Sequence, residues 1–179
     1  DIPPNHGCYE PVSVTVPGRS LLDPEPPAAV VGGNVETSQR VADTVLSAFA
    51  ELVPDRLPAQ SQGTMNNLTI GSRDGDSYSY YETIGGGFGA RPTKDGMDGV
   101  QVGMTNTLNT PIEALEAEYP LRVTRYGLRP DSGGRGRYRG GLGIERQLLV
   151  EVPSTVSLLT ERRRYPPSGV AGGDDGLCG

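Results

Sequence analysis

The sequence predicts an α+β fold: one strand-rich domain with a long helix near residues 35–52 and a short helix near residues 111–119. The length of 179 residues suits a single domain with its own core. Apolar residues recur at helical spacing in two segments, whereas most of the second half alternates with the period of a strand. With no Trp and only two Phe, the core is expected to consist mainly of Val, Leu, Ile and Ala.

The first third of the chain is predicted to begin as extended backbone and to continue into the long helix. Val12, Val14 and Val16 alternate with polar residues, which is typical of a half-buried strand. Asn34 is suited to cap the helix, and Pro54 ends it. The stripe expected to face the core consists of Val41, Val45, Ala48, Phe49 and Leu52.

Residues 66–84 are predicted to form a β-hairpin, with Asp74-Gly75 at its turn. In the returning strand, alternation places Glu82 on the same face as aromatic and aliphatic neighbours. If this face is buried, desolvation favours the protonated acid, which suits a general acid or base. The alternative is a carboxylate paired with one of the many arginines. The residues that share this face are Tyr78, Tyr80, Glu82 and Ile84.

The second helix has a clear start signal at residues 110–113, where Thr110 is the expected N-cap, followed by Pro111 and by the Glu of a capping box. Pro120 is expected to end it. Strands are then predicted at about 121–129, 142–152 and 155–162.

Two glycine segments, residues 85–89 and 131–143, place glycines beside charged and aromatic residues. Clustered glycines indicate shaped loops, and such loops can present backbone N–H groups to an anion. Neither segment contains the lysine of a phosphate loop or the spacing of a dinucleotide fingerprint. We therefore expect no nucleotide to bind directly to this chain.

Charge and cysteine content narrow the function classes further. The net charge is −6, and the arginine-rich end after residue 119 is better explained by ion pairs or subunit contacts than by nucleic acid. One His and two distant Cys give no metal-ligand spacing, and aspartates beside glycines fit turns better than a cation site. No apolar run reaches membrane-spanning length. We expect no metal, nucleic acid or membrane partner, and a cytoplasmic location.

Six segments in consistent order resemble the hydantoinase B family, and together the resemblance covers about residues 5–173. The family includes N-methylhydantoinase B subunits, the corresponding half of ATP-dependent 5-oxoprolinase, and acetone carboxylase large subunits. The matching segments are 33–40 (GNVETSQR), 59–67 (AQSQGTMNN), 81–87 (YETIGGG), 95–96 (DG), 131–134 (DSGG) and 139–143 (RGGLG).

The resemblance implies a C-terminal portion, residues 1–179, of a hydantoinase B-type subunit that acts in a hetero-oligomer with a hydantoinase A-type ATPase. ATP with magnesium would bind to that partner. Family members that hold a divalent metal would do so through His and Asp motifs in an N-terminal half, which this sequence does not contain.

The expected function is therefore ATP-dependent opening of a 5-oxoproline or hydantoin-type ring, a small cyclic amide, by an assembly in which this chain is not active alone. The alternatives are a subunit of an acetone-type carboxylase and a non-catalytic assembly domain. Glu82 and Asp95 are the predicted catalytic residues. The predicted substrate-binding residues are Gly85, Gly86, Gly87, Arg91, Asn66, Asn106, Asp131 and Ser132.

Overall fold

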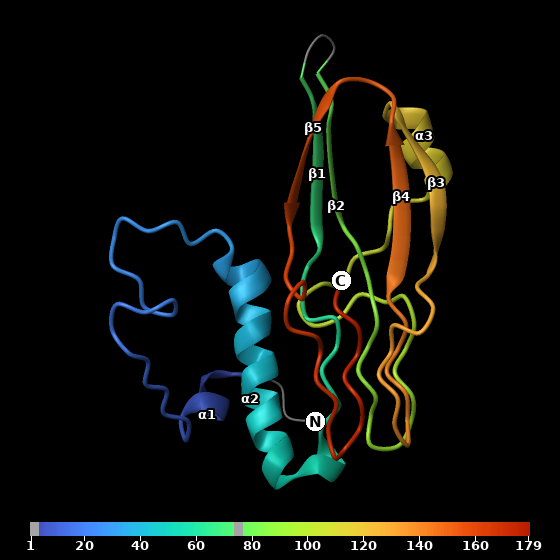
Figure 1. The fold of residues 1–179 in the computed structure, drawn as a ribbon. Helices are drawn as coiled ribbons and strands as arrows, with labels where there is room; N and C mark the ends of the chain where they lie inside the picture. Colours follow the sequence, from blue (N-terminus) through green and yellow to red (C-terminus); the bar gives the residue numbers. More distant parts are fainter. Residues whose placement is uncertain (1–3, 74–76) are drawn as a thin grey trace. The chain divides into compact units, whose positions relative to one another are not determined.

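The computed structural model describes residues 4–73 and 77–179, and the chain separates into two compact units, Asp1–Val30 and Val31–Gly179 (Figure 1). In the first unit, a short helix α1 (His6–Tyr9) is followed by turns and irregular chain with one isolated bridge between Ser20 and Asp23. The strand predicted at residues 12–16 is wrong: Val14 is 80% exposed and no strand forms there. Alternating valines do not make a strand when no neighbouring strand is available to pair with them.

The long helix of the second unit is confirmed. A π-helical turn (Gly33–Thr37) leads into α2 (Ser38–Leu52), and a 3-10 turn η2 (Pro54–Arg56) follows at the predicted end. The predicted burial of its apolar stripe is wrong, because Val45, Phe49 and Leu52 are 48–78% exposed. The helix instead turns Gln39 and Ala50 inward.

Antiparallel strands form two sheets, which confirms the α+β class. In one sheet, β1 (Asn67–Ser72) lies between β2 (Ser79–Thr83) and β5 (Ser154–Leu159). The other sheet pairs β3 (Leu121–Leu128) with β4 (Ile144–Val150). The predicted hairpin therefore exists, although its expected turn, Asp74-Gly75, lies outside the described residues.

The hydrophobic core lies between the two sheets. Leu68 and Ile70 of β1, Tyr80 of β2 and Leu121 of β3 form one buried cluster with Leu115 of α3 (Ile112–Glu118). The short helix is thus present where the sequence predicts it.

The start of α3 differs from the predicted capping box. No side chain caps the helix, and Pro111 stands at the N-cap position. The backbone N–H of Thr110 donates instead to Oε1 of Glu82, at 2.8 Å. A distant strand therefore supplies the acceptor that the local sequence was expected to supply.

Both glycine segments extend from the same end of the sheets. Antiparallel register brings the starts of β1 and β4 to the same end as the finishes of β2, β3 and β5. Figure 1 shows long extended stretches running on from this end. Both glycine segments belong to these stretches, since the first follows β2 and the second precedes β4.

Candidate functional site

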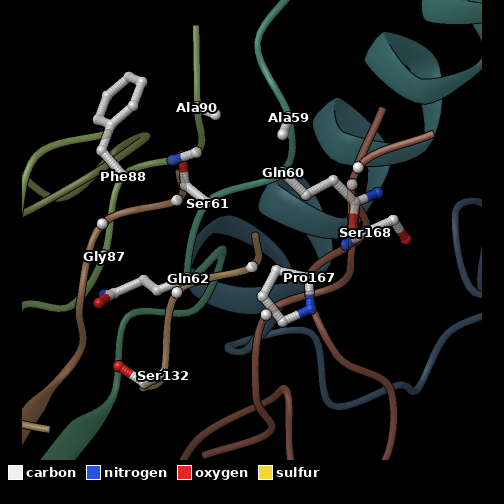
Figure 2. Close-up of a pocket in the computed structure, with 18 of the residues that line it drawn as sticks. Ala59, Gln60, Ser61, Gln62, Gly87, Phe88, Ala90, Ser132, Pro167 and Ser168 are labelled. Atoms are coloured by element: carbon white, nitrogen blue, oxygen red, sulfur yellow. Dashed lines mark hydrogen bonds between the residues drawn. The ribbon is translucent and has the colours of Figure 1, made fainter. Parts of the chain in front are cut away.

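Both glycine segments line one cavity of about 390 Å³. Its walls also include Gln60 and Gln62 before β1, and Ser168 near the end of the chain. Figure 2 shows Gln60 beside Ser168, with Ser132 on the other side of the view. Gln60 and Ser168 are joined by a 3.0 Å hydrogen bond from the Ser168 N–H to the Gln60 side chain. Four stretches that are distant in sequence thus meet around this space.

The glycines allow backbone to cross backbone at this site. A Cβ on Gly87 would come within 2.1 Å of the Gly141 carbonyl oxygen, and one on Gly141 within 1.9 Å of the Met97 carbonyl oxygen. The Gly141 N–H donates to the Phe88 carbonyl at 2.8 Å, and the Phe88 N–H donates to Met97 at 2.9 Å. Any side chain at these positions would force the segments apart.

The predicted site residues Gly85, Gly86 and Gly87 lie on the cavity wall, as does Arg91. The Arg91 guanidinium lies 5.7 Å from the centre of the Phe88 ring. It also donates to the backbone oxygen of Asp95 at 3.1 Å.

Ser132 and Asn66 also line the cavity. The Ser132 hydroxyl donates to the Arg129 carbonyl and accepts from the Gly143 N–H, each at 2.8 Å, which closes the second glycine segment on itself. Asp131 precedes Ser132 but does not belong to the wall, and the exposed Asn106 lies apart from it.

Asp95 does not line the cavity either. Its side chain accepts the Arg139 N–H at 2.8 Å. Asp98 accepts the Arg139 guanidinium through both carboxylate oxygens, at 2.8 and 2.9 Å. Arg139 and the N–H of Leu142 hold the pKa of Asp98 below its usual value. The two aspartates therefore hold the second glycine segment in place through hydrogen bonds to Arg139.

Glu82 lies in the core between the sheets, outside the cavity wall. Its side chain is 3% exposed and forms an ion pair with Arg146 of β4, whose side chain is 2% exposed. The Tyr80 hydroxyl donates to the same carboxylate at 2.5 Å. Burial and the hydrogen bond to Glu82 raise the pKa of Tyr80 to about 12, so the phenol remains a donor.

Left-handed backbone at non-glycine residues gathers around the cavity. Such conformations are strained and concentrate at functional sites, and Asn or Asp adopt them more readily than Arg or Ala. Three of these residues line the cavity and a fourth adjoins it. They are Asn66, Arg162 and Ala171 on the wall, at φ 47°, 63° and 50°, and Asp131 beside it at φ 55°.

Arg162 is a site residue that sequence reasoning missed, and nothing distinguishes it from its neighbours in the run of three arginines at 162–164. Its buried guanidinium donates to the side chain of Asp43 on α2, at 2.7 Å, and to the carbonyl of Pro166, at 3.0 Å. A third bond reaches the Gln62 carbonyl at 3.3 Å. Burial lowers the pKa of Arg162 and raises that of Asp43.

The cavity wall carries more positive than negative side chains. Five arginines line it against three acidic residues. Among the described residues, only one of these arginines, Arg162, forms an ion pair with a carboxylate. The arginines are Arg91, Arg129, Arg135, Arg137 and Arg162, and the acidic residues are Asp55, Glu161 and Asp174.

No group of three or more His, Cys, Asp or Glu suited to a metal occurs within residues 4–73 and 77–179. Within the same ranges, no helix is both long and apolar enough to span a membrane.

Comparison with known proteins places the chain in a family. The family model for hydantoinase B/oxoprolinase matches residues 1–179. A protein named 5-oxoprolinase 1 from Arabidopsis thaliana is 51% identical over all of this chain, which spans 13% of that relative. An uncharacterized protein from Methanocaldococcus jannaschii is 49% identical, and the chain spans 31% of it.

A solved structure shares the fold. The nucleotide-free structure of acetone carboxylase superposes with a TM-score of 0.52 over 69% of this chain and 17% of that one, at 23% identity. With the family model matching from end to end, the chain belongs to the hydantoinase B/oxoprolinase family.

Proposed function

We propose that this chain is part of an ATP-dependent cyclic amidohydrolase, which opens a 5-oxoproline or hydantoin-type ring together with a hydantoinase A-type ATPase partner. Family membership and the name of the Arabidopsis relative support this proposal. The chain spans only 13% of that relative, which supports a role as one part of a larger protein or assembly. In this proposal the assembly is a hetero-oligomer, and the chain is not active without it. A cytoplasmic location of this assembly is part of the proposal.

The observation that carries the proposal is the arginine-rich cavity shared by both glycine segments. A volume of about 390 Å³ is in the range of small-molecule sites. Arginines without acidic partners favour a ligand that bears a carboxylate, because the guanidinium fork binds it through two hydrogen bonds. A lactam with a carboxylate, such as 5-oxoproline, has this chemistry. Arg91, Arg135 and Arg137 are the proposed contacts.

Ring opening also needs donors for the oxyanion that forms when the amide carbonyl is attacked. Gly87 lines the cavity, and its N–H has no acceptor among the described residues. Its carbonyl, in contrast, accepts from the Gln62 N–H at 2.9 Å. We assign the Gly87 N–H as the candidate oxyanion donor.

ATP with magnesium is assigned to the partner, and a divalent metal to the part of the family chain that this sequence does not span. The described residues offer no fitting metal cluster, and the sequence has no phosphate loop.

The proposal is tested in the reconstituted enzyme with Arg135→Gln combined with Arg137→Gln. Loss of the carboxylate contacts is expected to raise KM for 5-oxoproline about ten-fold or more, while KM for ATP stays unchanged. Arg164→Gln is the matched control, since Arg164 does not line the cavity and stacks on Tyr165. Unchanged kinetic constants in the double variant would show that the cavity takes no part in the reaction.

A non-catalytic assembly domain is the second candidate, and the backbone crossings at Gly87 and Gly141 favour it. If the glycines serve only to let strands cross, the chain will bind the ATPase partner while cavity substitutions leave turnover unchanged. A subunit of an acetone-type carboxylase is the remaining alternative, and its support is limited to the fold shared with acetone carboxylase at 23% identity.

A further inference from the structure

We propose that Glu82 and Arg146 form a positioning pair, which fixes how the two glycine segments face each other across the cavity. The inference rests on the proposed function only in treating this cavity as the substrate site. The sequence allows two roles for Glu82, tuning of protonation and holding of residues 85–89, and the proposal develops the second by naming its partner on the other sheet.

The contacts leave the Glu82 carboxylate no free oxygen. Oε2 accepts from Arg146 and from the Tyr80 hydroxyl, while Oε1 accepts from the Thr110 N–H at 2.8 Å. The Arg146 guanidinium lies 5.1 Å from the centre of the Tyr126 ring. With both side chains almost fully buried and away from the cavity wall, neither reaches a ligand there.

The position of the pair in the chain connects it to both segments. Glu82 stands three residues before Gly85, and Arg146 stands three residues after Gly143. The ion pair also joins the two sheets, because β2 and β4 belong to different ones. A change in the distance between these two strands would therefore also shift the nearby ends of both glycine segments.

Stability alone is a poor explanation for this pair. Arg146 keeps two buried nitrogens, Nε and Nη2, without hydrogen-bond partners. A buried ion pair with unsatisfied donors is often no more stabilising than apolar side chains of similar size, and in some proteins such a pair serves to fix the relative placement of the elements it joins. Placement of the glycine segments is the role that the geometry supports.

The test is amide hydrogen exchange on the full 179-residue chain, without substrate, so that its result does not depend on the proposed function. In the double variant Glu82→Met with Arg146→Met, the Gly141 amide is expected to exchange about ten-fold faster, because it donates from the second segment to the Phe88 carbonyl in the first. The Leu68 and Ile70 amides in the central strand should change by less than about two-fold.

The control removes an exposed pair between β3 and β4: Arg125→Gln with Glu145→Gln, side chains that are 54% and 33% exposed. It should leave exchange in both glycine segments as in the wild type. If the Met pair folds with unchanged segment exchange, the positioning role is wrong. If the Met pair does not fold, amide exchange is measured in Arg146→Lys instead. Unchanged exchange in the glycine segments of that variant also overturns the proposal. Exchange there that is at least about three-fold faster supports it.

Discussion

Asp98 accepts hydrogen bonds from the Arg139 guanidinium through both carboxylate oxygens, at 2.8 and 2.9 Å, and from the backbone N–H of Leu142 at 2.8 Å. The aspartate follows the first glycine segment, whereas the arginine and the leucine belong to the second. One partly exposed carboxylate thereby ties the second segment to the stretch of chain that follows the first.

Replacing this carboxylate should cost more than replacing an ordinary surface charge. Asp98→Asn is expected to lower the free energy of unfolding by about 1 to 2 kcal/mol, because a bidentate bond and a charge-assisted bond to a backbone N–H are weakened together. Urea denaturation measures the change. Glu145→Gln is the control, since Glu145 meets Arg125 through a single exposed contact at 3.0 Å, and it should change stability by less than about 0.5 kcal/mol. Equal effects would contradict the special role of Asp98.

The contribution of Asp98 should also depend on pH. Its pKa is lower in the folded chain than the usual 3.8, so its stabilisation is present above that value and is lost as the pH falls through the lower, folded pKa. The difference in unfolding free energy between wild type and Asp98→Asn should therefore be constant from pH 5 to 7 and shrink in stronger acid. A difference that grows on acidification would refute this assignment.

Glu36 is predicted to act in the opposite sense. Burial, with a smaller contribution from Glu161, raises its pKa above 4.5, and Oε2 has no hydrogen-bond partner. Its charge therefore costs stability above the folded pKa, and the cost is relieved as the pH falls toward 4.5. Glu36→Gln should stabilise the chain by about 1 kcal/mol at pH 7, and this gain should vanish near pH 4.

Thermal unfolding at both pH values checks the Glu36 prediction. Glu51→Gln, at an exposed position on α2, is the matched control and should remain within about 0.5 kcal/mol of the wild type. A Glu36→Gln variant that is less stable than the wild type at pH 7 would show that the carboxylate is needed in its charged form.

A single methyl group at the crossing point should disrupt the site. Gly141→Ala is expected to lower stability by about 3 kcal/mol or more, because the new Cβ would lie 1.9 Å from the Met97 carbonyl and backbone cannot move aside as a flexible side chain can. In Gly127→Ala, the added Cβ meets nothing within 4 Å, so this variant should remain within about 0.5 kcal/mol of the wild type. Similar melting temperatures for the two variants would argue against close crossing.

Local patterns made most of the secondary structure of residues 31–179 predictable from the sequence, although the alternating valines at 12–16 misled. The helical spacing before Pro54 and the alternation around Glu82 each depend on neighbours within a few residues, and both predictions are confirmed. The face that α2 buries was not predictable in this way, because it depends on what packs against the helix. The stripe that includes Phe49 is exposed instead.

The candidate site was predictable only in part, since its contacts join distant positions. The glycines marked the segments that line the cavity, but the partner of Glu82 lies 64 residues away on another sheet. Fifteen arginines were available as partners, and spacing could not select among them. The sequence did not mark Arg162 as a site residue, because its left-handed backbone and its hydrogen bond to Asp43 arise only in the folded chain.

The meeting of distant stretches around the cavity has a consequence for the order of folding. The Ser168 amide reaches a side chain 108 residues earlier, and Arg162 reaches one 119 residues earlier, so much of the chain must be in place before the walls exist. Helix α2 and the β1–β2 hairpin need only local contacts and are free to form first. A partly folded chain would thus show its helix and much of its sheet signal while still lacking a binding site, which makes ligand binding a stricter measure of completed folding than any spectrum of secondary structure.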